Sequence, residues 1–258
     1  MKLERIQEGL FNPSIAVLRG DEYLAFRRDK PPWNSGKSAI LVSKNGSQPL
    51  VAKVGVEDPR LFVYAGHLLC SYNTTFAAKG CCIGVMELDG PSVVSDRVLK
   101  YGAPIEKNWA FFSFGTRIYC IYNHNPYTVL SFGANWSISK KTHATNMSWD
   151  YGPIRGGTPP ARIGDNCYTF FHSSLPTKHV GICVGPYYTG CLEFSARPPF
   201  APKRYTKKPL YSPTGDEDLA IFPGGAVFRD GTWRLACGRN NVGSCILEIP
   251  HSEVERAL

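Results

Sequence analysis

One carboxylate in the chain has a sequence setting suited to acid–base chemistry. In the segment VGVEDPRLF, Asp58 is followed by Pro59 and Arg60. The proline restricts the local backbone, and the arginine places a permanent cation nearby. A carboxyl group positioned in this way can serve as a general acid or base. The same pattern would also suit an aspartate that only caps a turn at the start of a strand.

A second acidic group lies much further along the chain. Asp216, Glu217 and Asp218 are consecutive and fall in a Pro-rich segment, 197–218, that we expect to be a long loop. One of these residues could supply a second carboxylate to a reaction site. The alternative is that all three are simply solvated.

Motifs for other chemistries are missing. The sequence has no G-x-G-x-x-G and no G-x-S-x-G, and the segment ending in Gly36-Lys37-Ser38 lacks the first glycine of a phosphate-binding P-loop. No C-x-x-C occurs, and the histidines are too few in any one place for a dedicated metal site. We therefore expect neither a metal nor a cofactor.

Five similar segments must position whatever chemistry the chain performs. Each has a polar or Pro-containing entry, an apolar run, a glycine, and a second apolar run that ends in polar residues. Their glycines are Gly20, Gly66, Gly115, Gly164 and Gly231, spaced 46, 49, 49 and 67 residues apart. Short β-rich runs on either side of a glycine are typical of a hairpin, because glycine adopts the backbone angles that a tight turn requires.

Further strand-like stretches lie between the hairpins, so each repeat holds about four strands. Four strands repeated five times predict an all-β fold, a five-bladed β-propeller, in one domain that spans 1–258. A β-sandwich is the alternative, but it does not require five similar hairpins. We expect GSCILEIP near the C-terminus to pair with the N-terminal segment and close the ring, and HSEVERAL to be the one helix.

The repeats also predict where a site lies. Residues eight places before and after each turn glycine meet at the open end of a hairpin, and five open ends meet at one end of a central channel. This reasoning predicts a polar ring of Asn12, Arg27, Arg28, Asp58, Arg60, Lys107, Asn108, Asn123, His172, Arg239, Asn240 and Asn241. Such a ring could bind a polar substrate. The alternative is a set of loop caps and exposed strand ends.

The motifs FNPSI, VEDPRLF, EKNWAFF, GGTPP, FFHSS and FPGGAVF, in that order, resemble glycoside hydrolase family 130. The resemblance covers about residues 11 to 241. It implies a five-bladed propeller that acts on β-mannosides by phosphorolysis or mannosyl transfer. It also implies that Asp58 is the proton donor, that Asn12, Lys107 and Asn108 line the sugar site, and that His172 helps to hold phosphate.

Two segments depart from the family pattern. Tyr187-Tyr188-Thr189-Gly190 stands where the family has an arginine after the tyrosine, and Asn241 replaces a sugar-binding aspartate. The full predicted set is Asp58 as the catalytic residue, with substrate-binding residues Asn12, Arg28, Arg60, Lys107, Asn108, Asn123, Thr158, His172, Glu217, Arg239 and Asn241.

The number of carboxylates separates the possible reactions. An inverting phosphorylase or transferase needs one protein acid or base, whereas a glycosidase ordinarily needs two carboxylates. One clear carboxylate in the ring favours glycosyl transfer to or from phosphate or a sugar acceptor. Hydrolysis would require Glu217 or a neighbour to reach the site. A glycan-binding propeller without catalysis is the third interpretation, because the fold alone does not determine function.

Composition limits the partners and the cellular location. The chain has 258 residues, 29 Lys and Arg against 21 Asp and Glu, and a net charge of +8. The basic residues are scattered, which suits an ordinary surface or an anionic substrate such as phosphate or a sugar phosphate; no nucleic-acid motif accompanies them. The nine cysteines are odd in number and irregularly spaced, so we expect free thiols. Without a membrane-length apolar run or a secretory signal, we expect a cytoplasmic protein with no membrane partner.

Overall fold

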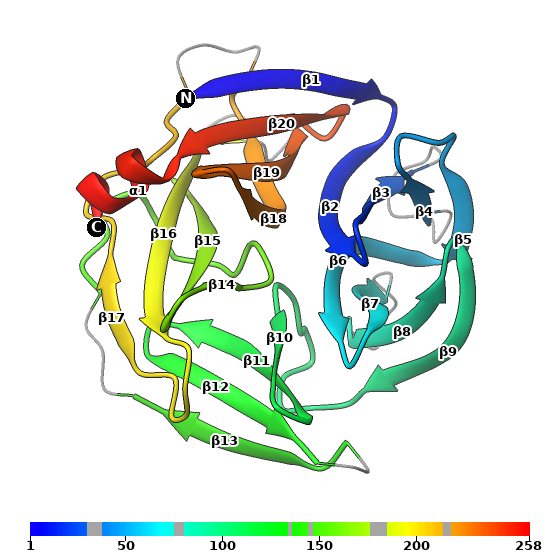
Figure 1. Cartoon of the computed structure of the whole chain (residues 1–258), viewed down its shortest axis with the longest axis horizontal. Coiled ribbons are helices and arrows are strands. Elements are labelled where there is room, and N and C mark those ends of the chain that lie inside the picture. Colours follow the sequence, from blue (N-terminus) through cyan, green and yellow to red (C-terminus); the bar gives the residue numbers. More distant parts are fainter. Residues whose placement is uncertain (30–37, 75–79, 134–135, 144–146, 176–184, 214–217) are drawn as a thin grey trace.

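Five antiparallel sheets of four strands each make up the protein. This computed structural model describes the chain except for residues 30–37, 75–79, 134–135, 144–146, 176–184 and 214–217. The sheets are arranged around a central axis, and β2, β6, β10, β14 and β18 lie nearest to it (Figure 1). The fold is therefore the five-bladed β-propeller that the repeats predicted.

Each sheet forms one blade, and its strands are named from the innermost to the outermost. Blade 1 comprises β2 (Phe11–Leu18), β3 (Asp21–Arg28), β4 (Ala39–Lys44) and β5 (Leu50–Val54). Blade 2 comprises β6 (Val56–Tyr64), β7 (His67–Thr74), β8 (Ile83–Asp89) and β9 (Ser92–Leu99). Blade 3 comprises β10 (Ala110–Phe114), β11 (Arg117–His124), β12 (Tyr127–Phe132) and β13 (Ile138–Thr142).

The last two blades contain the predicted closure. Blade 4 comprises β14 (Ala161–Ile163), β15 (Asn166–Ser174), β16 (Tyr187–Ser195) and β17 (Pro202–Tyr205). Blade 5 comprises β18 (Ile221–Arg229), β19 (Thr232–Arg239), β20 (Gly243–Pro250) and β1 (Lys2–Glu8). The N-terminal strand β1 thus pairs with β20, as predicted, and the helix α1 (His251–Ala257) follows directly. The segment expected to be a long loop, 197–218, instead includes the outer strand β17.

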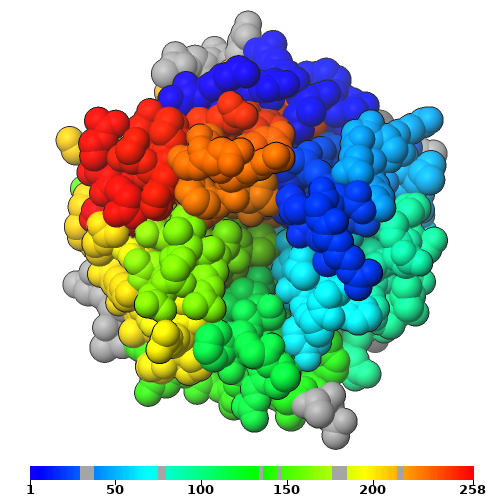
Figure 2. Space-filling view, viewed as in Figure 1, coloured from blue at the N-terminus to red at the C-terminus, as the bar shows by residue number. Residues whose placement is uncertain are grey.

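The five predicted hairpin turns are confirmed. Every turn glycine has a positive φ, between 57° at Gly115 and 89° at Gly20, which side chains with a Cβ rarely adopt. The glycine is the second residue of the two-residue turn in blades 1, 2 and 5 and the first in blades 3 and 4. In the space-filling view the blades follow one another around the molecule in the order of the sequence (Figure 2).

The hydrophobic core lies between neighbouring blades. One buried cluster joins Ile40 and Val42 of blade 1 to Leu61 and Met86 of blade 2. The clusters between the other blades are built in the same way, with aromatic side chains prominent between blades 3 and 4. Both faces of a blade are therefore apolar, and polar side chains collect at strand ends. In the described part of the chain, no helix is long and apolar enough to cross a bilayer.

Candidate functional site

The inner strands begin with an irregular backbone that presents polar side chains to the channel. Asn12, Asp58 and Asn108 adopt left-handed φ angles of 46°, 52° and 62°. In blades 1 and 2 the irregular residue is followed by a proline, and the pairing with the second strand shifts register there. Such a bulge redirects one side chain without ending the strand. Three blades therefore present an amide or carboxylate at the same place.

These side chains line a cavity of about 260 Å³ at the open end of the hairpins. Its lining is polar or charged on most sides. It consists of Asn12, Arg27, Asp58, Lys107, Asn108, Arg155, His172, Tyr187, Ala220, Phe222, Gly238 and Asn241. Among the described lining residues, Asp58 is the only carboxylate, and three cations line the cavity with it: Arg27, Lys107 and Arg155.

Asp58 is held by hydrogen bonds to both carboxylate oxygens. Asn12 Nδ2 donates to Oδ1 at 2.8 Å, and Asn73 Nδ2 donates to Oδ2 at 3.0 Å. Burial alone would raise the pKa of Asp58, but the charge of Arg27 and the bond from Asn12 outweigh it, so the pKa lies below its ordinary value. Asp58 is therefore ionised at neutral pH in the unliganded protein.

Arg27 joins Asp58 to two further carboxylates. Its Nη1 lies 3.0 Å from Asp58 Oδ1 and 3.0 Å from Glu57 Oε2, while Asp29 binds the same guanidinium through Nε at 2.8 Å and Nη2 at 2.6 Å. Burial raises the pKa of Glu57, although Arg27 and Lys107 oppose that shift. The Glu57 side chain is only 3% exposed, so it supports the site from behind and does not line the cavity.

Arg60 is a buried cation beneath the cavity. Its Nη2 donates to Asn108 Oδ1 at 3.3 Å, and its guanidinium carbon lies 5.1 Å from the centre of the Phe222 ring. Burial lowers the pKa of Arg60 to about 10, and Asp58 opposes the shift. Its Nη1 is buried without a hydrogen-bond partner among the described residues. Gly224 packs closely against the Arg60 guanidinium, since a Cβ at this position would lie 3.3 Å from Nη1. The absence of a side chain on Gly224 therefore leaves room for Arg60.

His172 is buried at the wall of the same cavity. Its ring stacks on Tyr187 at 5.7 Å and meets Phe222 edge-on at 4.4 Å. Burial and the nearby Arg60 and Arg155 hold its pKa well below the ordinary value, so the ring is neutral. Its Nδ1 is buried without a partner in the described structure. A neutral imidazole beside two arginines can donate a hydrogen bond to an anion or to a sugar hydroxyl.

The structure brings together about half of the predicted site residues. Asn12, Asp58, Lys107, Asn108, His172 and Asn241 all line the cavity, with Arg60 directly below it. Glu217 lies outside the described residues. Four other predicted residues do not line the cavity: Arg28, Asn123, Thr158 and Arg239.

Each of those four has a structural reason to lie elsewhere. Arg28 follows Arg27 on the same strand, so its side chain leaves from the opposite face of the sheet. Asn123 bonds to the backbone of Asn125 in the β11–β12 turn. Thr158 is fully buried, and its hydroxyl accepts from the amide of Phe170 at 3.0 Å.

Arg239 connects the site to the ring closure. Its Nη2 lies 2.5 Å from Glu8 of β1, and its Nη1 lies 3.7 Å from Asp218. Asp218 is the one member of the acidic group 216–218 that the structure describes, and its carboxylate pairs with Arg239. The pair stabilises the junction of β1 and β19 next to the cavity.

Several cavity residues were not predicted as site residues. Arg155 precedes the first strand of blade 4, and its backbone pairs with His172, with N to O distances of 2.8 and 3.1 Å. Tyr187 and Phe222 supply the aromatic walls. Asn73 reaches Asp58 from seven places after Gly66, as Arg27 does from seven after Gly20. The bulge adds one residue to the first strand of these two hairpins, so equal counting from the turn missed Asn73, whereas Arg27 was already in the predicted polar ring.

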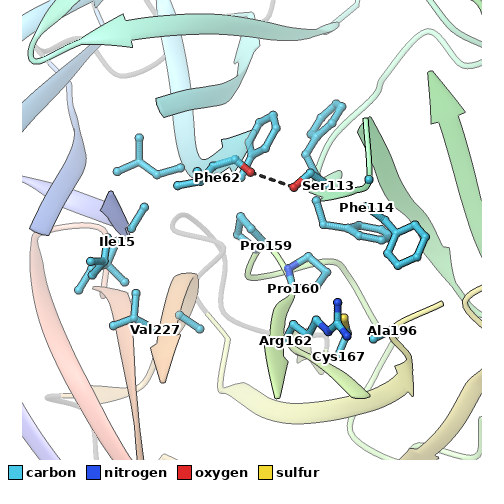
Figure 3. A pocket seen from close by; sticks show the side chains of 18 residues that line it. Ile15, Phe62, Ser113, Phe114, Pro159, Pro160, Arg162, Cys167, Ala196 and Val227 are labelled. Carbon is cyan, nitrogen blue, oxygen red and sulfur yellow. Dashed lines mark hydrogen bonds between the residues drawn. The ribbon is translucent and has the colours of Figure 1, made fainter. Parts of the chain in front are cut away.

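The other ends of the inner strands enclose a second cavity, of about 380 Å³. Its lining is mainly apolar and includes Ile15, Phe62, Pro159, Pro160 and Val227 (Figure 3). Ser113 Oγ donates to the carbonyl of Val63 at 3.1 Å across its edge. This end is apolar and has no carboxylate among the residues that line it.

No metal-binding arrangement is found within the described residues, where no three His, Cys, Asp or Glu side chains come together suitably. The eight cysteines that the structure describes are all unpaired. The reactive groups of the polar cavity are thus a carboxylate, a neutral imidazole, amides and cations.

Known structures resemble this one over almost its whole length. No protein-family model matches the sequence, and no curated protein matches it significantly. A β-1,2-mannobiose phosphorylase from Listeria innocua, in complex with β-1,2-mannobiose, superposes with a TM-score of 0.74 at 14% identity, covering 100% of this chain and 99% of that one.

Two further structures extend the comparison. A mannose phosphorylase from Leishmania mexicana, in complex with phosphate, has a TM-score of 0.61 at 13% identity and covers 95% of this chain and 84% of that one. A member of the GH130 family described with hydrolases of β-1,2-mannosidic linkages in Candida mannan has a TM-score of 0.67 at 12% identity, covering 96% and 86%. The chain therefore has the fold of glycoside hydrolase family 130 mannoside phosphorylases, the family that its motifs resemble.

Proposed function

We propose that the protein is a carbohydrate-active enzyme that transfers a glycosyl unit, specifically a mannosyl unit, to or from phosphate or a sugar acceptor, with Asp58 as its general acid and base. Residues 1–258 would act as one domain, because β1 completes the last blade. The mannosyl assignment rests on the structural neighbours, which include phosphorylases of mannosides.

The observation that carries the proposal is the charge arrangement of the polar cavity. Asp58 lines it together with Arg27, Lys107 and Arg155, and Arg60 lies below. A cavity with several cations and one carboxylate suits an anionic substrate such as phosphate or a sugar phosphate. The amides of Asn12, Asn108 and Asn241 suit the hydroxyl groups of a sugar.

The proposed reaction is one displacement at the anomeric carbon. In phosphorolysis, Asp58 first takes up a proton, from dihydrogen phosphate or from solvent. A phosphate oxygen then forms a bond to that carbon while the glycosidic C–O bond breaks, and the leaving oxygen takes the proton from the Asp58 carboxyl group. In synthesis, the ionised Asp58 removes the proton from the acceptor hydroxyl as phosphate leaves. The lowered pKa favours the ionised form that synthesis requires. Attack from the face opposite the leaving group inverts the configuration.

Hydrolysis is the second candidate, and the described carboxylates support it less well than transfer. Activation of water in an inverting hydrolase needs a second carboxylate at the reaction site. Of the described candidates, Glu57 is enclosed by Arg27 and Lys107, and Asp218 is paired with Arg239. Since one structural neighbour belongs to a group that contains hydrolases, the test must include water as the acceptor.

The test is a product assay with the full chain. The protein is incubated with β-mannosides with and without phosphate, and with mannose 1-phosphate or a nucleotide-linked mannose plus sugar acceptors, and mass spectrometry identifies the products. We expect turnover that depends on phosphate or donor. Asp58→Asn is expected to reduce it by about 10²- to 10⁴-fold, the usual contribution of a general acid or base.

Two outcomes contradict the proposal. Free mannose released equally with and without phosphate would assign hydrolysis. Glycan binding without any turnover, unchanged in Asp58→Asn, would assign a non-catalytic glycan-binding propeller. Thr158→Ser serves as the control for a predicted residue that does not line the cavity, and its turnover should remain close to that of the wild type.

A further inference from the structure

The five outer strands differ in how they protect their free edges. Each is paired on one side only, which leaves a row of backbone groups open to another strand. Three of these strands carry charges or proline along the edge: β1 (KLERIQE), β13 (ISKKT) and β17 (PKRY). Lysine, arginine and proline on an edge strand are ordinary devices against pairing with other chains.

The outer strands of blades 1 and 2 carry fewer such residues, with one lysine in β5 and one aspartate and one arginine in β9. Their sequences are LVAKV in β5 and SVVSDRVL in β9. Twelve large hydrophobic side chains are exposed among the described residues, and six of them lie on these two strands, whereas β13 and β17 have none. We call these six the valine edge: Leu50, Val51, Val54, Val93, Val94 and Val98. Val54 is 71% exposed and Val94 is 61% exposed.

The valine edge forms one continuous surface on the rim of the propeller. The strands β5 and β9 lie on the same side of the molecule, at the right in Figure 1. Lys53 Nζ lies 2.7 Å from Asp96 Oδ2, which joins the two strands. Val93 and Val98 project from the same face of β9 as Asp96, because all three pair with residues on one face of β8, across a bulge at Val94. Exposed valines therefore surround a single ion pair.

We propose that the valine edge is a dimer interface that binds a second copy of this chain. A two-fold axis repeats the same surface on both partners, so β5 of each copy lies against β9 of the other and every one of the four free edges is covered. One foreign strand would cover only one of them.

Charge complementarity also favours a second copy. In the two-fold arrangement, Lys53 of each copy lies close to Asp96 of the other, so both charges keep an opposite partner. Two chains of net charge +8 repel each other over most of their surface. On β5 and β9 the charges of Lys53 and Asp96 cancel and Arg97 is the one charge left over, while the apolar side chains gain from leaving water.

The test is the molar mass of the full chain from about 1 to 100 µM, the range in which modest homodimers dissociate, measured by sedimentation and by light scattering. We expect a mass that rises to twice that of one chain. Val54→Lys and Val94→Lys should each raise the dissociation constant about tenfold or more, since they place a charge at the centre of the interface. Val242→Lys is the matched control, because Val242 is 51% exposed but lies in the β19–β20 turn.

Circular dichroism shows whether each variant remains folded. We expect all of them to fold, because the substituted side chains are exposed. A monomer throughout that range overturns the proposal. So does a dimer that both edge variants leave intact, and so does equal weakening by Val242→Lys. The mass measurement requires no substrate, so it is independent of the proposed enzymatic function.

Discussion

The two ends of the central channel are built from the same inner strands and differ in nearly every physical property. At the end that contains Asp58, the strands begin with left-handed residues and bulges, and the side chains form ion pairs and amide hydrogen bonds. At the other end the same strands run as regular ladders into glycine turns, and their side chains are apolar. The comparison suggests that irregular backbone marks the functional end, whereas regular packing at the turns holds the blades together.

Close backbone contacts make the polar end possible. A Cβ on Gly238 would lie 2.2 Å from Asn12 Oδ1, and one on Gly224 would lie 2.3 Å from the carbonyl of Pro13. Blade 5 therefore approaches blade 1 so closely that only glycine fits at these positions. This approach holds Asn12 against Asp58.

The largest expected difference between the two ends comes from removing a cation at each. Arg27→Met leaves Asp29, Glu57 and Asp58 without their shared guanidinium, and removing one partner of a buried ion pair typically costs about 3–5 kcal/mol. The free energy of unfolding in urea should fall by about that amount. Arg162→Met, at the exposed rim of the apolar cavity, should change it by less than about 0.5 kcal/mol. Similar losses in both variants would show that the polar end has no special electrostatic role.

A core substitution at the apolar end should separate stability from activity. Phe62 is 5% exposed and stacks on Phe111 at 5.4 Å. Phe62→Ala should lower the free energy of unfolding by about 3–4 kcal/mol, because it removes packed apolar surface and leaves a cavity. Turnover per folded molecule should stay within about twofold of the wild type, since kcat depends on the other end. A large fall in kcat, measured where the variant is still folded, would contradict the division between the two ends.

Acid should weaken the polar end selectively. Burial lowers the pKa of His124 from 6.5 to about 4, and burial with neighbouring arginines lowers that of His172 in the same direction. A folded-state pKa below the unfolded value means that the stabilisation is complete above pH 6.5 and is lost as the pH falls toward 4. For His124 alone, the loss approaches about 3 kcal/mol at pH 4.

Urea titrations between pH 7 and 4.5 measure this loss. His124→Gln should flatten the pH dependence in this interval, because the titrating group is gone. His67→Gln provides the control, since His67 is exposed beside Glu87 on blade 2. An equally steep dependence in His124→Gln would show that other groups dominate the acid response.

The sequence was sufficient to predict the fold because glycine turns and apolar runs recur with a nearly constant spacing. It also predicted the ring closure, since GSCILEIP needs a partner strand and β1 supplies one. Both features depend on local chemistry repeated five times. The long segment of blade 4 was harder to predict, because Pro-rich composition hides the short strand β17.

The candidate site was predicted less completely, for a geometric reason. Counting from the turns placed Lys107 level with Asn12 and Asp58, but Asn108 has the matching left-handed backbone, and β10 pairs with β11 without a register shift. A one-residue shift exchanges the two faces of a strand, and this explains why Arg27 rather than Arg28 reaches Asp58. Arg155 could not be found by counting, since it precedes the strands of its blade.

The smallest predicted effect tests whether the apolar end depends on any polar contact. Ser113 is exposed at the edge of that cavity, and its hydroxyl donates to the carbonyl of Val63 in the neighbouring blade at 3.1 Å (Figure 3). Ser113→Ala should lower the free energy of unfolding by about 0.5–1 kcal/mol, because a solvent-accessible hydrogen bond contributes little net stability. Ser139→Ala, on the outer strand β13, removes a hydroxyl pair with Ser131 and is the matched control. A loss of several kcal/mol specific to Ser113→Ala would mean that a hydrogen bond between blades, rather than packing, holds the turn end together.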